Sequence, residues 1–97
     1  MTIPQQRLVK TAIPGPRSVE LHARKTAAVA SGVGTTLPVY VARAGGGIVV
    51  DVDGNQLIDF GSGIAVTSVG NAAPRVVAAR AAAGCRIHPH LFYGHAL

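Results

Sequence analysis

The sequence predicts an α+β fold: an N-terminal helix, a three-stranded antiparallel meander, a glycine-rich loop and a second helix. Three short β-prone runs lie in the middle of the chain, at Val39–Ala42, Ile48–Val52 and Gln56–Phe60. They are separated by Gly45-Gly46-Gly47 and by Asp53-Gly54-Asn55, which are turn sequences because Gly and Asn tolerate a positive φ. Alanine-rich stretches on either side of these runs favour helices.

The segment before the first helix is expected to be an arm, residues 1–17, that belongs to no regular element. It ends in Pro14-Gly15-Pro16, which cannot continue a helix because proline lacks the N–H donor and restricts its predecessor. We expect this arm to be mobile.

The first helix is predicted from Ser18 onward, and Gly32 and Gly34 end it. Ser18 is the expected N-cap, and Glu20 is expected in the first turn, where the helix dipole favours an anion. Leu21, Ala28 and Val29 can share one face. This face carries little hydrophobic bulk, so the helix needs a partner surface.

The meander carries three acidic residues, Asp51, Asp53 and Asp59. Their spacing does not match a calcium-binding loop, so no metal site is expected there. Asp53 precedes Gly54 and is interpreted as a turn residue. Asp59 interrupts an apolar run and is expected to accept a hydrogen bond from a backbone amide of the next loop.

The loop Gly61-Ser62-Gly63-Ile64 has almost no side-chain bulk before Ile64, so its backbone can approach a ligand closely. It lacks the spacing of phosphate-binding loops, and a phosphate site is therefore not expected in it. Asn71-Ala72-Ala73-Pro74 is predicted to be a turn that leads into a helix from Arg75 to about Ala83.

Composition limits the class of protein. The 97 residues carry a net charge of +5, but the basic residues form no dense run, so no nucleic-acid partner is expected. No run approaches the ~20 apolar residues that span a bilayer, so no membrane partner is expected either. The single Cys85 cannot form an internal disulfide, and a reducing, cytoplasmic location fits.

The central segment resembles a known family. Gly47 to Gly70 contains G-x-x-x-D-V-D-G-N-x-L-I-D-F-x-x-G-I-A-V-x-x-x-G, and Pro74 and Val76-Val77 follow. Together with the upstream A-I-P-G-P-R-S-x-E-L-H-A-R-K, this pattern resembles the N-terminal part of class III pyridoxal-phosphate aminotransferases, closest to 4-aminobutyrate (GABA) aminotransferases. The resemblance covers about Arg7 to Ala82, so residues 18–82 are expected to be the N-terminal segment of an aminotransferase domain of PLP fold type I.

The resemblance implies a substrate-binding role for Gly63 and Ile64. Ile64 matches the family position whose aliphatic side chain walls the amino-acid pocket and favours a linear ω-amino acid. The alternative is that Ile64 packs beneath the meander. The parent family transfers an amino group from 4-aminobutyrate to 2-oxoglutarate, uses pyridoxal phosphate, and forms homodimers or larger assemblies.

The catalytic residues of that family are not expected in this chain. The only lysines are Lys10 and Lys25, and neither has the family's context for the Schiff-base lysine. We therefore expect no catalytic residue, no cofactor-binding residue and no bound pyridoxal phosphate for this chain alone, which is interpreted as a truncated, inactive aminotransferase fragment.

Residues 83–97 form a divergent tail that contains the only Cys and three of the four His. Read one base later, codons for Cys85 to His90 can encode Ala-Glu-Phe-Thr-His, which the family has at this point, so we hypothesise an out-of-frame tail. A zinc site of Cys85, His88, His90 and His95 is the competing interpretation, and it matches no standard spacing. The alternative function is then a small basic binding protein with a Cys/His-containing tail.

Overall fold

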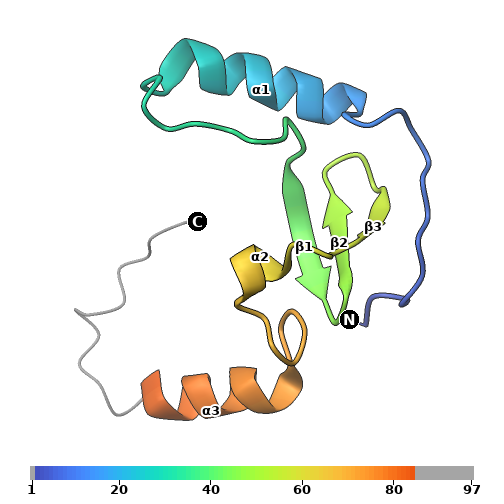
Figure 1. Ribbon diagram of the computed structural model, residues 1–97, viewed down its shortest axis with the longest axis vertical. Coiled ribbons are helices and arrows are strands. Elements are labelled where there is room, and N and C mark those ends of the chain that lie inside the picture. The colour runs from blue at the N-terminus through green and yellow to red at the C-terminus, as the bar shows by residue number, and fades with distance from the viewer. Residues whose placement is uncertain (1, 85–97) are drawn as a thin grey trace.

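The computed structural model describes residues 2–84, which form a small antiparallel sheet with helices at its two ends (Figure 1). In chain order the elements are α1 (Pro16–Ala28), β1 (Val41–Gly45), β2 (Ile48–Asp51), β3 (Gln56–Ile58), α2 (Ser62–Ala65) and α3 (Pro74–Gly84). The strand order is β1-β2-β3, and both pairs are antiparallel, so the predicted meander and α+β class are confirmed. Ala83 and Gly84 of the predicted tail belong to α3, and the rest of that tail, with its Cys and His residues, lies outside the described residues.

Strands β2 and β3 start at the predicted residues, Ile48 and Gln56, and end one and two residues earlier than predicted, whereas β1 differs from the prediction at both ends. β1 extends to Gly45, which pairs with Ile48, so only Gly46 and Gly47 form the turn between β1 and β2. This tight turn requires the positive φ of 59° at Gly46. The prediction ended this strand at Ala42, because the three glycines do not show which of them pair.

The turn between β2 and β3 is organised by the buried carboxylate of Asp51. Its Oδ1 accepts hydrogen bonds from the backbone N–H groups of Asp53 and Asn55, and its Oδ2 accepts one from Asn55 Nδ2. Side-chain acceptors of this kind replace backbone partners in turns. The predicted turn at residues 53–55 is therefore confirmed, but Asp51, rather than Asp53, holds it.

The arm is not a mobile segment, which corrects the prediction for residues 1–17. Leu8 and Gln56 exchange two backbone hydrogen bonds of 3.0 and 2.7 Å, so the arm pairs with the outer edge of β3. Further along, the Asn55 side chain accepts hydrogen bonds from the N–H groups of Lys10 and Thr11. Polar side chains of the sheet therefore satisfy the arm's backbone.

Helix α1 starts earlier than predicted and is capped by a residue distant in sequence. Gly15 is the N-cap position, and the carboxylate of Asp53 accepts hydrogen bonds of 2.8 and 3.0 Å from the N–H groups of Arg17 and Ser18. Ser18, the predicted cap, is instead fully buried, and its Oγ accepts a hydrogen bond from the N–H of Tyr40. Glu20 consequently lies beyond the first turn.

The apolar core is small. Among the described residues only three hydrophobic side chains are buried, Ile3 from the arm and Ile48 and Val50 from β2. Ile48 and Val50 point to one face of the sheet, and Val49 points to the opposite face. Ala28 and Val29 are exposed, so the partner surface expected for the first helix is absent from the described part of the chain.

Candidate functional site

The glycine-rich loop that follows β3 is held at its base by Asp59. Oδ1 of Asp59 accepts a 2.8 Å hydrogen bond from the N–H of Ser62, and Oδ2 accepts one of 2.8 Å from Nδ2 of Asn71. The bond from Ser62 confirms the predicted role of Asp59. The side-chain bond from Asn71, followed by the bond from Ser62, lowers the pKa of Asp59 below its ordinary value.

Asn71 ties the same loop to the turn between β1 and β2. It exchanges backbone hydrogen bonds of 2.9 and 2.7 Å with Gly46. Gly70 fits against this bridge because a Cβ there would lie 3.0 Å from the carbonyl oxygen of Gly46. Residues 59–71 therefore form a closed loop whose two ends are joined by Asp59 and Asn71.

The loop begins with a left-handed turn. Ser62, Gly63, Ile64 and Ala65 have φ values of 50°, 61°, 62° and 63°. For residues with a Cβ this conformation costs about 1–2 kcal/mol each, and Ile64 is β-branched, which adds crowding. The turn is held by hydrogen bonds from the N–H groups of Val66 and Thr67 to the carbonyl of Ser62. Strain of this kind is concentrated at binding and catalytic sites.

The two predicted substrate-binding residues lie at the middle of this turn. Gly63 is exposed, and the side chain of Ile64 is 95% exposed, so Ile64 does not pack beneath the meander as the alternative interpretation held. A large aliphatic side chain that stands on a strained backbone and is almost fully exposed is available to contact a ligand.

The loop does not fit a phosphate group. The N–H of Ser62 already donates to Asp59, and those of Ala65 and Val66 donate to the carbonyls of Gly61 and Ser62. The Asp59 carboxylate at the base of the loop would also repel an anion.

The two lysines do not form a cofactor site with this loop. Nζ of Lys25 donates to the carbonyl of Val33, 2.9 Å away, and to the hydroxyl of Thr35, both in the connection after α1. Lys10 lies on the arm beside the turn between β2 and β3, where its N–H donates to Asn55. The described residues therefore do not fit pyridoxal phosphate as a Schiff base.

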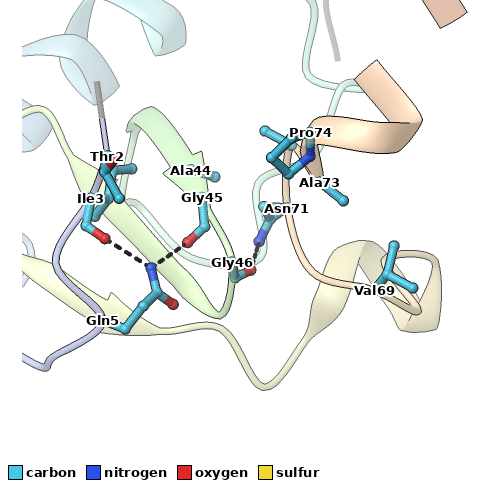
Figure 2. A pocket seen from close by; sticks show the side chains of 11 residues that line it. Thr2, Ile3, Gln5, Ala44, Gly45, Gly46, Val69, Asn71, Ala73 and Pro74 are labelled. Atoms are coloured by element: carbon cyan, nitrogen blue, oxygen red, sulfur yellow. Dashed lines mark hydrogen bonds between the residues drawn. The ribbon is translucent and has the colours of Figure 1, made fainter. Parts of the chain in front are cut away.

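A pocket of about 440 Å³ lies where the arm meets the sheet and the start of α3 (Figure 2). Nε2 of Gln5 donates to the carbonyls of Ile3 and Gly45, and its Oε1 accepts from the N–H of Gly47. Gln5 and Asn71 thus support the β1–β2 turn from two sides. No local pattern pointed to Gln5, because the turn groups that it bonds, on Gly45 and Gly47, are 40 and 42 residues away.

A second hollow, here called the apolar groove, lies on the sheet face opposite Ile48 and Val50 and has a volume of about 480 Å³. Its apolar wall consists mainly of Ile13, Leu37, Val41, Val49, Leu57, Ile58 and Phe60. Gly61 lines its end, so the groove adjoins the left-handed turn. Phe60 is 90% exposed although it is the residue directly before this loop.

Neither a metal cluster nor a membrane helix is found in residues 2–84. No three His, Cys, Asp or Glu side chains converge there as metal ligands. No helix in that range has the length and apolar character to cross a bilayer. His22 of α1 places Nδ1 3.2 Å from the hydroxyl of Tyr40, so it packs within the fold.

Comparison with known proteins identifies close relatives of this segment. A family model described as Aminotransferase class-III matches residues 28–91, which extends past Ala82 into the predicted tail. The chain is 67% identical over 76 residues to the 4-aminobutyrate aminotransferase of Mycobacterium tuberculosis (strain ATCC 25618 / H37Rv), covering 78% of this chain and 17% of that protein.

More distant relatives are named for other activities. The 5-aminovalerate aminotransferase of Pseudomonas putida is 49% identical over 59 residues, 61% of this chain and 14% of that protein. The alanine/serine racemase of Pyrococcus horikoshii is 43% identical over 67 residues, 68% of this chain and 14% of that protein. The chain thus spans less than a fifth of the length of these relatives.

Proposed function

Because the chain belongs to the class-III aminotransferase family, we propose that its Gly61–Ala65 loop forms one wall of the substrate pocket of a 4-aminobutyrate-type aminotransferase. The residues proposed to contact the substrate are Gly63 and Ile64. Ile64 presents its aliphatic side chain to the methylene chain of a linear ω-amino acid, and Gly63 lets the backbone approach it. The observation that carries the proposal is the 95% exposure of Ile64 on a strained turn.

We propose 4-aminobutyrate as the substrate on the basis of sequence identity to the relatives. The 4-aminobutyrate aminotransferases of two mycobacteria are 67% and 62% identical to this chain, whereas the 5-aminovalerate aminotransferase of P. putida is 49% identical. The proposed reaction transfers the amino group of 4-aminobutyrate to 2-oxoglutarate. Pyridoxal phosphate supplies the electron sink for this chemistry in the family.

The 97 residues alone are proposed to be inactive. Lys25 is engaged by Thr35 and Val33, and Lys10 lies on the arm, so neither supports a Schiff base. The proposed role of this chain is to shape the substrate pocket and to orient the substrate. Asp59 and Asn71 hold the loop in place, and the loop sets the position of Ile64.

Several further properties belong to the same proposal. The segment is the N-terminal part, residues 18–82, of a domain of PLP fold type I, with an arm at 1–17 and a separate tail at 83–97. The complete enzyme is a cytoplasmic homodimer or larger assembly.

Sequencing the gene around codon 83 tests whether the tail is translated out of frame, since the frameshift hypothesis requires a downstream frame that encodes the rest of the domain.

A chimera tests the proposed role of the loop. Residues 28–84 of this chain replace the matching segment of the M. tuberculosis enzyme, and kcat/KM is measured for 4-aminobutyrate and 5-aminovalerate. Ile64→Ala is expected to lower kcat/KM for 4-aminobutyrate about tenfold, because a lost aliphatic contact in a pocket is worth about 1–3 kcal/mol. Val66→Ala, a change outside the left-handed turn, is the control. Equal kcat/KM values for the chimera and its Ile64→Ala variant would contradict the proposal.

A further inference from the structure

Two hydroxyl groups meet inside the loop that carries Ile64. The side-chain oxygens of Ser62 and Thr67 lie 2.6 Å apart and form a hydrogen bond. Within residues 61–69 these two residues are half-buried and all the others are exposed. Because this part of the loop buries no apolar side chain, its conformation depends on hydrogen bonds, and the hydroxyl pair forms its interior.

Thr67 connects the left-handed turn to the closed end of the loop. Its N–H donates to the carbonyl of Ser62, 3.1 Å away, so the backbone and the side chain of Thr67 both hold Ser62. The carbonyl of Thr67 accepts a 3.0 Å hydrogen bond from the N–H of Gly70, and the next residue, Asn71, is bonded to Gly46. Thr67 therefore links the first residue of the turn to the end of the loop that is fixed on the sheet.

Ser62 depends on such contacts because its backbone is strained. Its φ is 50°, and the left-handed conformation continues to Ile64, whose φ is 62°. A residue with a Cβ keeps this conformation only where surrounding contacts hold it. The hydroxyl bond to Thr67 adds a contact through the side chain of Ser62 to those that its backbone makes.

We propose that Thr67 is a positioning residue for substrate selection. Through Ser62 its hydroxyl holds the turn that places the side chain of Ile64, and thereby sets the length of ω-amino acid that the pocket prefers. This inference rests on the proposed function of the Gly61–Ala65 loop. A pocket wall that is held in one place discriminates between substrates that differ by one methylene, whereas a wall that moves accommodates both.

The test uses the chimera that carries residues 28–84. Its kcat/KM is measured for 4-aminobutyrate and for 5-aminovalerate, and the ratio of the two values is compared between variants. This ratio does not depend on the fraction of enzyme that is folded, so a loss of stability alone leaves it unchanged. Thr67→Val removes the hydroxyl and keeps the shape of the side chain. It is expected to lower the ratio about threefold, the order of effect of one lost neutral hydrogen bond.

Two further variants serve as controls. Thr67→Ser keeps the hydroxyl and is expected to give the same ratio as the unsubstituted chimera. Ser68→Ala, an exposed change at the next residue, is also expected to leave the ratio unchanged. The proposal is overturned if Thr67→Val leaves the ratio unchanged, or if Thr67→Ser lowers it as far as Thr67→Val does.

A measurement on the 97-residue chain separates this proposal from the proposed function. The NMR coupling between the N–H and Hα protons of Ile64 reports its φ, and it is expected to change in Thr67→Val and to be preserved in Thr67→Ser. If the coupling changes but neither Thr67→Val nor Ile64→Ala alters the kinetics of the chimera, the loop does not contact the substrate and both proposals fail. If Ile64→Ala lowers kcat/KM while Thr67→Val changes neither the coupling nor the ratio, the substrate contact stands and Thr67 is not its positioning residue.

Discussion

The Asn71 side-chain amide donates a 2.8 Å hydrogen bond to the Asp59 carboxylate. This contact closes the loop of residues 59–71 by joining its first residue to its last. The second oxygen of the same carboxylate accepts the N–H of Ser62, the first residue of the left-handed turn. One ionised side chain therefore fixes both the closure of the loop and the start of its strained segment.

This arrangement predicts a dependence on pH. The pKa of Asp59 lies below its ordinary value of 3.8, because Asn71 and Ser62 donate hydrogen bonds to the ionised form. The stabilisation is therefore complete above the unfolded-state pKa and is lost as pH falls through the lowered folded-state pKa. The protection factor of the Ser62 amide, which corrects its exchange rate for the intrinsic effect of pH, is measured by NMR from pH 6 to about pH 2 and is expected to fall only in the acid range.

Two variants of the loop test whether Asn71 lowers the pKa of Asp59. Asn71→Ala is expected to raise the pKa of Asp59 towards 3.8, since the largest stabilising contact of the carboxylate is removed. Ser68→Ala, an exposed change in the same loop, is expected to leave it unchanged. An NMR titration in which the Asp59 carboxyl carbon gives the same midpoint in the wild type and Asn71→Ala would refute the assignment.

Asn55 is predicted to be the most sensitive polar residue of the fold. Its fully buried side chain makes four hydrogen bonds, from the N–H groups of Lys10 and Thr11 and to Thr11 Oγ1 and Asp51 Oδ2. Asn55→Ala removes all four hydrogen bonds and is expected to cost about 2–4 kcal/mol of unfolding free energy. Urea denaturation followed by circular dichroism measures this cost. Gln6→Ala, an exposed change on the arm, is expected to change it by less than about 0.5 kcal/mol.

The cap of α1 is tested by a pair of glycine variants. A Cβ on Gly15 would lie 2.4 Å from Cγ of Asp53 and 2.7 Å from Oγ1 of Thr11, so Gly15→Ala displaces the capping carboxylate. Amide exchange of Arg17 and Ser18 is expected to accelerate as the first turn of α1 frays. Gly32→Ala is the control, because no atom lies within 4 Å of its added methyl. Unchanged exchange in Gly15→Ala would exclude Asp53 as the cap.

The strained turn predicts that a substitution that relieves the strain raises stability and lowers activity. Ile64→Gly removes a β-branched side chain from a left-handed backbone and is expected to stabilise the chimera by about 1 kcal/mol, while lowering kcat/KM for 4-aminobutyrate. Val66→Gly, at a residue of negative φ, is expected to be destabilising. A loss of stability in Ile64→Gly, measured by thermal unfolding, would show that the turn is unstrained.

The local pattern was sufficient for much of the fold. The turn residues and β-prone runs predicted the three antiparallel strands, Pro74 predicted the start of α3, and the spacing from Gly47 to Gly70 identified the family. Each of these signals comes from residues a few positions apart, where backbone conformation is decided by side-chain size, φ preference and nearby hydrogen bonds.

Contacts between distant residues were not predictable in the same way. The capping of α1 by Asp53, the pairing of the arm with Gln56, and the closure of the loop by Asn71 join groups separated by 12 to 48 residues. A sequence specifies which groups can donate or accept, but only tertiary structure decides which of them meet. The exposure of Ile64 and Phe60 is of this second kind, because burial depends on which segments the folded chain brings against a side chain.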